Sequence, residues 1–269
     1  MAKGVLAKMS TFNVGSEFNV APEYTLILDD EIVSMNNLIG KKIKVEFDNE
    51  IYCIKCGRKT KKSFGQGFCY PCFISAPEAE ECVLRPELCR AHEGVARDLN
   101  FAKENCLIDH FVYLAWSGGL KVGVTRNHQI PTRWIDQGAT YAIKVCRTSN
   151  RYEAGIVEVE LKKIFGDKTP WQAMLKGFND DSINLLNEKS KALEFINGKG
   201  LSYMLEEDNL YRISFPVETY PLKVSSVNLD KEPVVEAVLA GIKGQYLIFD
   251  SNKVFNVRNH SGYRVNLLF

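Results

Sequence analysis

The cysteines of this chain are spaced as ligands of a metal ion. Cys53 and Cys56 form one Cys-x-x-Cys pair, and Cys69 and Cys72 form a second pair after twelve intervening residues. Two such pairs on tight turns place four thiolates around one tetrahedral zinc ion, and Gly57 after the first pair favours its turn. Disulfides and redox pairs are the alternatives, but a thioredoxin-like motif would need a βαβ pattern that is not visible here. We therefore predict a structural zinc site.

Three further cysteines and two histidines indicate a second metal site. Cys82, Cys89 and Cys106 supply three thiols, and either His92 or His110 could complete a tetrahedral set with them. Their spacing is irregular, so buried free thiols and ordinary surface histidines remain the alternative. The sequence thus predicts one or two structural zinc ions per chain.

A run of basic residues separates the two Cys-x-x-Cys pairs. Arg58, Lys59, Lys61 and Lys62 lie in it, and no acidic residue occurs from position 53 to position 72. A solvated loop would explain such a run. The sharper hypothesis is a surface that contacts the phosphates of DNA or RNA. We name these four residues the basic strip.

Residues 111–178 have the pattern of a small α/β domain. Val112–Ala115 and Leu120–Val124 are the predicted strands of a hairpin, because Ser117–Gly119 supplies a turn with the positive backbone angles that glycine allows. A short helix is predicted after the hairpin, and a second helix over residues 151–165.

The motifs of this domain resemble those of the GIY-YIG endonuclease superfamily over about residues 110–178. Val112-Tyr113-Leu114 stands where that family has Gly-Ile-Tyr, and Lys121-Val122-Gly123 stands where it has Tyr-Ile-Gly. The second motif, with lysine at its first position, is similar to the motif of the phage-derived branch of the superfamily. Arg133 matches the arginine of the first helix, and Glu158 best matches the metal-binding glutamate of the later helix. The whole chain, with its cysteines, also resembles an uncharacterised bacterial family of zinc-containing proteins.

The resemblance implies metal-dependent phosphodiester hydrolysis. Glu158 would hold a Mg²⁺ or Mn²⁺ ion against the scissile phosphate, Arg133 would pair with its nonbridging oxygens, and Lys121 would add positive charge. Tyr113 would orient or deprotonate the attacking water, which requires a phenol pKa well below its usual value of about 10. Arg126, after the second motif, is expected to contact nucleic acid. Because Lys121 replaces the second tyrosine of the family, catalysis could be altered or absent.

Ordinary packing or solvation could account for several of these residues. A different helix phase would replace Glu158 by Glu153 or Glu160. Trp134 and Trp171 could stack on bases, but core packing is the preferred interpretation. Tyrosines in strands commonly pack, and single charged residues on helices commonly form solvated ion pairs. The order of the motifs, taken together, favours the nuclease-like interpretation.

Composition limits the classes of function. The chain has 269 residues, of which 45% are hydrophobic and 25% charged, as in ordinary globular proteins. Its net charge of +1 means that any argument for nucleic acid must rest on local patches. We expect no membrane span and no cleavable signal, and hence a cytoplasmic location, where reducing conditions leave thiols free for zinc.

The remaining segments are predicted to frame these parts in an α+β fold. Residues 1–52 and 201–269 alternate as β-strands, and residues 179–200 form an amphipathic packing helix that starts at an Asp180 cap. We expect the strands of the two ends to form one discontinuous β-barrel, with the zinc-binding segment 53–110 and the α/β domain inserted in it. The strand-like runs of the C-terminal part are 212–215, 234–239, 245–249, 253–257 and 263–267.

Two hypotheses of function follow. In the first, zinc modules present DNA or RNA to an endonuclease site formed by Tyr113, Lys121, Arg133 and Glu158. In the second, a zinc-stabilised module binds nucleic acid or protein without cleaving it. Convergence of the four side chains in one open basic cleft would favour the first. The sequence does not determine the oligomeric state.

Overall fold

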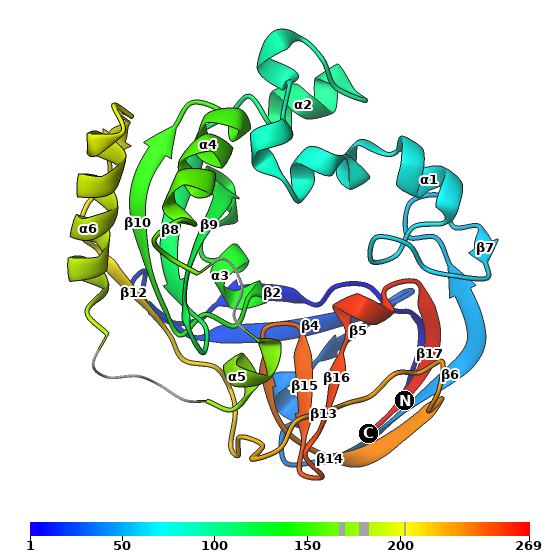
Figure 1. Ribbon diagram of the computed structural model, residues 1–269. Coiled ribbons are helices and arrows are strands. Elements are labelled where there is room, and N and C mark those ends of the chain that lie inside the picture. The colour runs from blue at the N-terminus through cyan, green and yellow to red at the C-terminus, as the bar shows by residue number, and fades with distance from the viewer. Residues whose placement is uncertain (167–169, 178–182, 202) are drawn as a thin grey trace.

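Strands from both ends of the chain pair in one sheet. The computed structural model describes residues 1–166, 170–177, 183–201 and 203–269 (Figure 1). In its 8-stranded sheet, β1 (Ala2–Val5) pairs with β17 (Tyr263–Leu268), β17 pairs with β6 (Lys42–Tyr52), and β6 pairs with β14 (Val234–Lys243). The predicted pairing of N-terminal with C-terminal strands is therefore present, and the rest of the chain is inserted between them.

This sheet is open. Its order continues from β14 through β15 (Tyr246–Phe249) and β16 (Lys253–Asn256) to β13 (Ser225–Ser226), and β7 (Lys59–Thr60) pairs with β6. Among the described strands no pairing joins β1 to β13, so the sheet does not close into a barrel.

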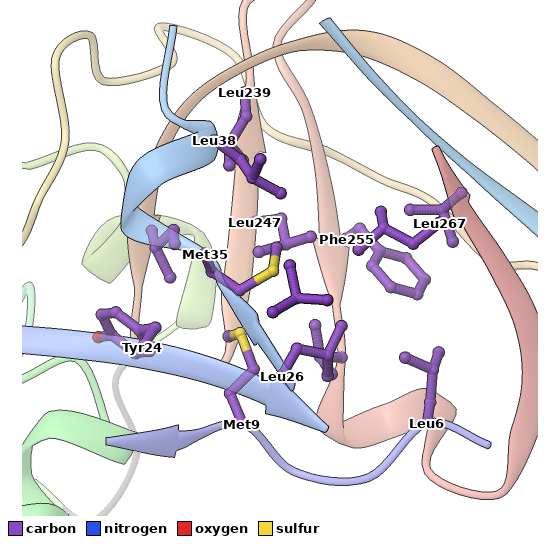
Figure 2. Close-up of a cluster of buried hydrophobic side chains, with 14 of the residues drawn as sticks. Leu6, Met9, Tyr24, Leu26, Met35, Leu38, Leu239, Leu247, Phe255 and Leu267 are labelled. Carbon is purple, nitrogen blue, oxygen red and sulfur yellow. The ribbon is translucent and has the colours of Figure 1, made fainter. Parts of the chain in front are cut away.

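A smaller sheet completes the core of this part. The 3-stranded sheet contains β2 (Ser10–Asn13), β4 (Pro22–Leu28) and β5 (Glu31–Ser34). The alternating burial of β4 sends Tyr24 and Leu26 into the same cluster as residues of β14 to β17. Figure 2 shows this cluster, in which each fully buried leucine contributes about 1.5 to 3 kcal/mol of transfer free energy.

The predicted hairpin forms one end of a 6-stranded sheet, with β9 at its edge. β8 (His110–Trp116) and β9 (Leu120–Arg126) are antiparallel, with Tyr113 opposite Gly123. Gly118 in the turn has the positive φ of 72° that favours glycine. β10 (Tyr141–Thr148) pairs with the other edge of β8.

Strands from outside the α/β segment complete this sheet. β12 (Leu210–Ile213) pairs with β10, β3 (Asn19–Val20) pairs with β12, and β11 (Met204–Leu205) also pairs with β10. The run at 212–215 was expected to join the strands of the two ends. Its first two residues do pair with the N-terminal β3, but in the 6-stranded sheet and not in the sheet of β1 and β17. There Tyr211 of β12 lies against Trp134, with ring centroids 4.6 Å apart.

Helices cover both faces of the 6-stranded sheet. α4 (Arg151–Leu161) and α6 (Leu185–Gly198) share a buried cluster with Val112 and Leu114, whereas α3 (Thr132–Asp136) packs on the opposite face through Trp134. α6 is the predicted packing helix, and Asn184 caps it. The expected Asp180 cap lies outside the described residues. α5 (Trp171–Leu175) lies against the β15 and β16 strands.

The cysteine-rich segment contains only short elements. It arches from the end of β6 to the start of β8 across the top of Figure 1. Its helices are α1 (Tyr70–Ser75) and α2 (Leu99–Asn105), and its 3-10 turns are η2 (Pro77–Ala79), η3 (Glu81–Val83), η4 (Pro86–Leu88) and η5 (Ala91–Glu93). The remaining 3-10 turns among the described residues are η1 (Asn36–Leu38), η6 (Asn127–Gln129) and η7 (Arg258–His260). Among the described residues no helix has the length and apolar character needed to cross a membrane.

The cysteine-rich segment is fitted closely onto α4. A Cβ atom added at Gly155 would lie 2.2 Å from the backbone nitrogen of Glu87 and 2.4 Å from the carbonyl carbon of Pro86. Glycine at this position therefore lets the backbone of η4 lie directly on the helix.

The substitution Gly155→Ala tests this contact. Alanine favours helices over glycine by about 1 kcal/mol, but the clash with η4 is expected to lower the free energy of unfolding by about 1 to 3 kcal/mol. Gly198→Ala in α6 is the matched control, because nothing lies within 4 Å of the added Cβ. Urea unfolding of both variants measures the difference. Equal stability of the two variants would show that η4 does not pack on α4 in solution.

Candidate functional site

The first cysteine cluster has the geometry of a zinc site. The sulfur atoms of Cys53, Cys56, Cys69 and Cys72 all lie within 4.8 Å of one another, and the Sγ atoms of Cys56 and Cys69 are 3.8 Å apart. Zinc–sulfur bonds of about 2.3 Å in a tetrahedron require sulfur–sulfur distances of about 3.8 Å. Gly57 has a φ of 69°, which supports the predicted turn. The four residues therefore fit a zinc ion.

The electrostatics around Cys53 favour a thiolate. Burial raises the pKa of this thiol, but hydrogen bonds from the backbone of Cys69, Cys56 and Lys55 outweigh burial and lower the pKa to about 6. A zinc ligand has to be deprotonated, so these amides prepare the sulfur for metal.

The second cluster contains three cysteines and neither histidine. Cys82, Cys89 and Cys106 are buried, with their sulfur atoms within 4.8 Å of one another. His92 instead stacks on Tyr152, and the Nδ1 atom of His110 hydrogen-bonds the carbonyl oxygen of Ile108 at 2.8 Å. The expected Cys3His set is therefore not assembled among the described residues. Three thiols can still hold zinc, with the fourth position taken by water or another ligand.

The basic strip is exposed beside aromatic rings. Lys59 forms an ion pair with Glu50, with Nζ and Oε1 2.6 Å apart, so its charge is balanced. Lys62 lies over the ring of Phe64 at 5.4 Å from the centroid, and Tyr70 packs edge-on against the same ring. Tyr70 itself is 57% exposed. The first zinc module thus presents cations and aromatic faces on one surface.

Tyr113 is central to the α/β domain but is sealed from solvent. Its exposed fraction is 0%, and a Cβ atom at Gly123 would lie 2.5 Å from its hydroxyl oxygen. The glycine of the second motif therefore makes room for the tyrosine of the first.

Gln137 links Tyr113 to Arg133. In the amide orientation that satisfies both neighbours, the Gln137 nitrogen donates to the Tyr113 hydroxyl at 2.9 Å. The Gln137 oxygen then accepts from Nε and Nη2 of Arg133 at 3.1 Å each. Gln137 therefore connects the buried phenol of Tyr113 to the guanidinium of Arg133 and orients it.

The environment of Tyr113 does not favour its expected role as a base. Burial raises the pKa of the phenol above its ordinary value, and the charge of Arg133 only partly opposes the rise. A base at this position would need a lowered pKa and access to water, and the phenol has neither.

Lys121 and Glu158 are also largely buried around Arg133. Burial, followed by the charge of Arg133, lowers the pKa of Lys121 to about 8. Burial raises the pKa of Glu158, although Lys162 opposes the rise from 3.5 Å. The second carboxylate oxygen of Glu158, Oε2, has no hydrogen-bond partner among the described residues.

The two glutamates that could replace Glu158, Glu153 and Glu160, form other contacts. Glu153 hydrogen-bonds Ser149 and Asn150 at the start of α4, and Glu160 pairs with Lys163 at the surface. Glu158 is therefore the inward-facing glutamate of this helix. Trp134 is fully buried, and Trp171 stacks on Tyr246 with ring centroids 5.6 Å apart. Both tryptophans pack as the preferred interpretation expected.

A cavity of about 170 Å³ lies beside Arg133, where several distant segments of the chain meet. Its walls come from the cysteine-rich segment (Cys82 and Pro86), from β8 and β9, from α3 and the first residue of α4, and from both ends of the chain. Of the four predicted catalytic residues, only Arg133 lines it. The predicted convergence in one open cleft is therefore incomplete.

The cavity is strongly cationic. Arg126, Arg133, Arg151 and Arg258 line it, and we name it the arginine cavity. Lys8 also lines it and forms an ion pair with Asp136, its one acidic lining residue. Asp136 also accepts a hydrogen bond from Gln245, 2.9 Å away. The arginine ion pairs among the described residues involve Arg85, Arg90, Arg147 and Arg264, and thus none of the four cavity arginines.

Burial makes these charges costly. Burial lowers the pKa of Arg126, and the charge of Arg151 lowers it further. Burial also lowers the pKa of Arg258, an effect that Asp136 opposes and Arg133 reinforces. Arg151 is only 7% exposed, and its Nη1 atom lies 3.6 Å from the Sγ atom of Cys82. The arrangement is thus suited to receive an anion.

His110 adds a neutral acceptor to the wall of the cavity. Burial lowers the pKa of its ring to about 4. Because Nδ1 faces the carbonyl oxygen of Ile108, Nδ1 carries the proton and Nε2 is an acceptor. Nε2 is buried and has no partner within the described part of the chain.

Sequence reasoning found Arg126 and Arg133 but missed Arg151 and Arg258. No motif marks Arg258, which lies in a 3-10 turn after β16 and reaches the cavity only through the tertiary fold. Arg151 had a weak signal, because it is the first residue of the helix that carries Glu158.

Comparison with known proteins gave one match. A family model described as "Protein of unknown function (DUF2797)" matches residues 40–265, which is most of the chain. Neither the curated proteins nor the solved structures gave a match.

Metal content tests both cysteine clusters. We expect the purified protein to hold two zinc ions per chain, one for each group of thiols. Cys69→Ser and Cys89→Ser should each reduce the content to one, whereas Cys146→Ala should leave two, because Cys146 lies in β10 outside both groups. Elemental analysis by mass spectrometry measures the content. Two ions retained in Cys89→Ser would remove the second cluster as a metal site.

Proposed function

The chain belongs to the DUF2797 family, whose description assigns no activity, and we propose that it binds nucleic acid through phosphate groups held in the arginine cavity. One observation carries the proposal. Four arginine side chains from separate segments surround a cavity of about 170 Å³, and none of them is among the arginine ion pairs of the described residues.

The free energy of these buried charges supports an anionic ligand. Bringing like charges together away from water is unfavourable unless a partner of opposite charge compensates them. Guanidinium groups pair with phosphate oxygens through two parallel hydrogen bonds. A bound phosphate would therefore offset the burial, and the smaller repulsion between arginines, that lower the pKa of Arg126 and Arg258.

Two further features favour nucleic acid over a small anion. The basic strip and the exposed ring of Tyr70 together offer charge for the backbone and an aromatic face for a base. The domain that carries Arg133 also resembles, in the order of its motifs, the GIY-YIG endonuclease superfamily, which acts on phosphodiesters. The zinc ions would hold the strip and the wall of the cavity in place. Such thiolate sites suit the reducing conditions of the cytoplasm, which we propose as the location.

Metal-dependent cleavage is a second candidate function, and one carboxylate oxygen favours it. The Oε2 oxygen of Glu158 is buried without a partner among the described residues. Mg²⁺ and Mn²⁺ sites in nucleases commonly use one or two carboxylates together with substrate phosphate and water. Glu158 would therefore share the ion with the substrate, and Arg133 would hold the phosphate. The phenol of Tyr113 would position Arg133 through Gln137 rather than remove a proton.

Binding measurements test the first candidate. Arg133→Ala and Arg258→Ala should each weaken binding of a fluorescent oligonucleotide by about tenfold, or about 1.4 kcal/mol. Each substitution should also reduce, by about one, the slope of the logarithm of the binding constant against the logarithm of the salt concentration. Arg147→Ala is the control, because Arg147 pairs with Asp109 outside the cavity. Equal loss in all three variants would show that general positive charge, and not the cavity, binds the ligand.

A cleavage assay separates the second candidate from the first. Mixed single- and double-stranded DNA and RNA are incubated with the protein and Mg²⁺ or Mn²⁺. Under the second candidate, products should appear with the unmodified protein and with Glu160→Gln, and should disappear with Glu158→Gln. Glu160 is the control because it is paired with Lys163 at the surface of the same helix. Cleavage that persists in Glu158→Gln, or no cleavage by the unmodified protein, contradicts this candidate and leaves binding untouched.

A further inference from the structure

The arginine cavity has features that an internal phosphate of a nucleic acid strand does not use. We infer that it selects a terminal phosphate monoester, the phosphorylated end of a DNA or RNA strand, over an internal phosphodiester. This inference rests on the proposed nucleic-acid binding and names the part of the ligand that the cavity recognises.

The charge of the cavity exceeds that of one diester. Lys8 and Asp136 compensate each other, and Arg151 lies 3.6 Å from the Sγ atom of Cys82. Arg126, Arg133 and Arg258 remain as cations in the wall of the cavity. An internal diester carries one negative charge, whereas a phosphate monoester carries about 1.5 to 2 near neutral pH. The monoester also offers three terminal oxygens instead of two. More of the guanidinium donors therefore find an acceptor when the phosphate is at a strand end.

Residues from distant segments of the chain form the walls of the cavity. The cysteine-rich segment contributes Cys82 and Pro86, the α/β domain contributes Arg126 and Arg133, and the C-terminal part contributes Arg258. An internal phosphate has to enter with the chain continuing on both sides, whereas a strand end enters with the chain on one side. A cavity of about 170 Å³ has room for a phosphate group and part of its sugar.

His110 supplies an independent observation. Its ring is 2% exposed, it lines the cavity, and its Nε2 atom is a buried acceptor without a partner among the described residues. A buried acceptor is stabilised by a donor. An internal phosphodiester in DNA has no hydroxyl group to donate. A terminal phosphate monoester can donate from its singly protonated form, because its second pKa is about 6.

Binding of matched strand ends tests the inference. Short single-stranded DNA oligonucleotides of one sequence, labelled at an internal base, are prepared with a 5′-phosphate, with a 3′-phosphate, or with hydroxyl groups at both ends. Their dissociation constants are measured by fluorescence anisotropy at one salt concentration with the zinc-loaded full chain. We expect at least one phosphorylated end to bind about tenfold or more tightly than the hydroxyl-ended strand, which corresponds to about 1.4 kcal/mol.

Variants connect the preference to the cavity. Arg258→Ala should remove most of the preference, Arg258→Lys should retain part of it, and Arg147→Ala should leave it unchanged. Zinc content and circular dichroism show that each variant is folded. Equal affinity for all three strands overturns the inference but leaves the proposed nucleic-acid binding intact. If no strand binds, the proposed function itself fails. A preference that persists in Arg258→Ala places the recognition outside this cavity and also overturns the inference.

Discussion

The structure depends on the docking of a segment that has almost no core of its own. Between β6 and β8 the chain forms only short helices and 3-10 turns, and its buried residues are mainly the cysteines and a few alanines. Hydrophobic burial alone offsets little of the conformational entropy of such a segment, and zinc held by its two cysteine clusters would add to its stability. Its contact with the rest of the chain is close, because Gly155 lets the backbone of η4 lie on α4. Through this contact the second cysteine cluster forms one wall of the arginine cavity.

The cavity itself is built by distant parts of the sequence. β3 and β12 extend the 6-stranded sheet with strands from the two ends of the chain, and the same ends supply Lys8 and Arg258. The repulsion among the arginines would push loose segments apart. Here the segments are fixed by paired strands and by shared hydrophobic clusters, which hold the charges in place. The stability of the sheets thus maintains a cationic site that is unfavourable by itself.

The sequence predicted the features that depend on residues close together along the chain, and missed those that depend on distant segments. The first zinc site is local, since its ligands occupy two short turns, and the structure brings all four sulfurs together. The hairpin was predictable for the same reason, because its turn and strands are adjacent. The ligand set of the second cluster was only partly predictable, because spacing does not reveal that His92 stacks on Tyr152. Arg258 could not be predicted, since its place depends on sheet pairings over almost the whole chain. The same holds for the pKa of Tyr113, which is set by burial under elements from other segments.

The burial of Tyr113 changes how the resemblance to a nuclease should be understood. The phenol, Gln137 and Arg133 form a connected chain from the core to the cavity. The buried end of this chain is rigid, and the guanidinium at the other end is therefore held in one direction. A site that hydrolyses phosphodiesters needs such an arginine, and so does a site that only binds them. The two proposed functions differ at Glu158, whose Oε2 atom is buried on α4, the helix on which η4 lies. Under the second proposal, a cation would have to reach this oxygen beside the docked cysteine-rich segment.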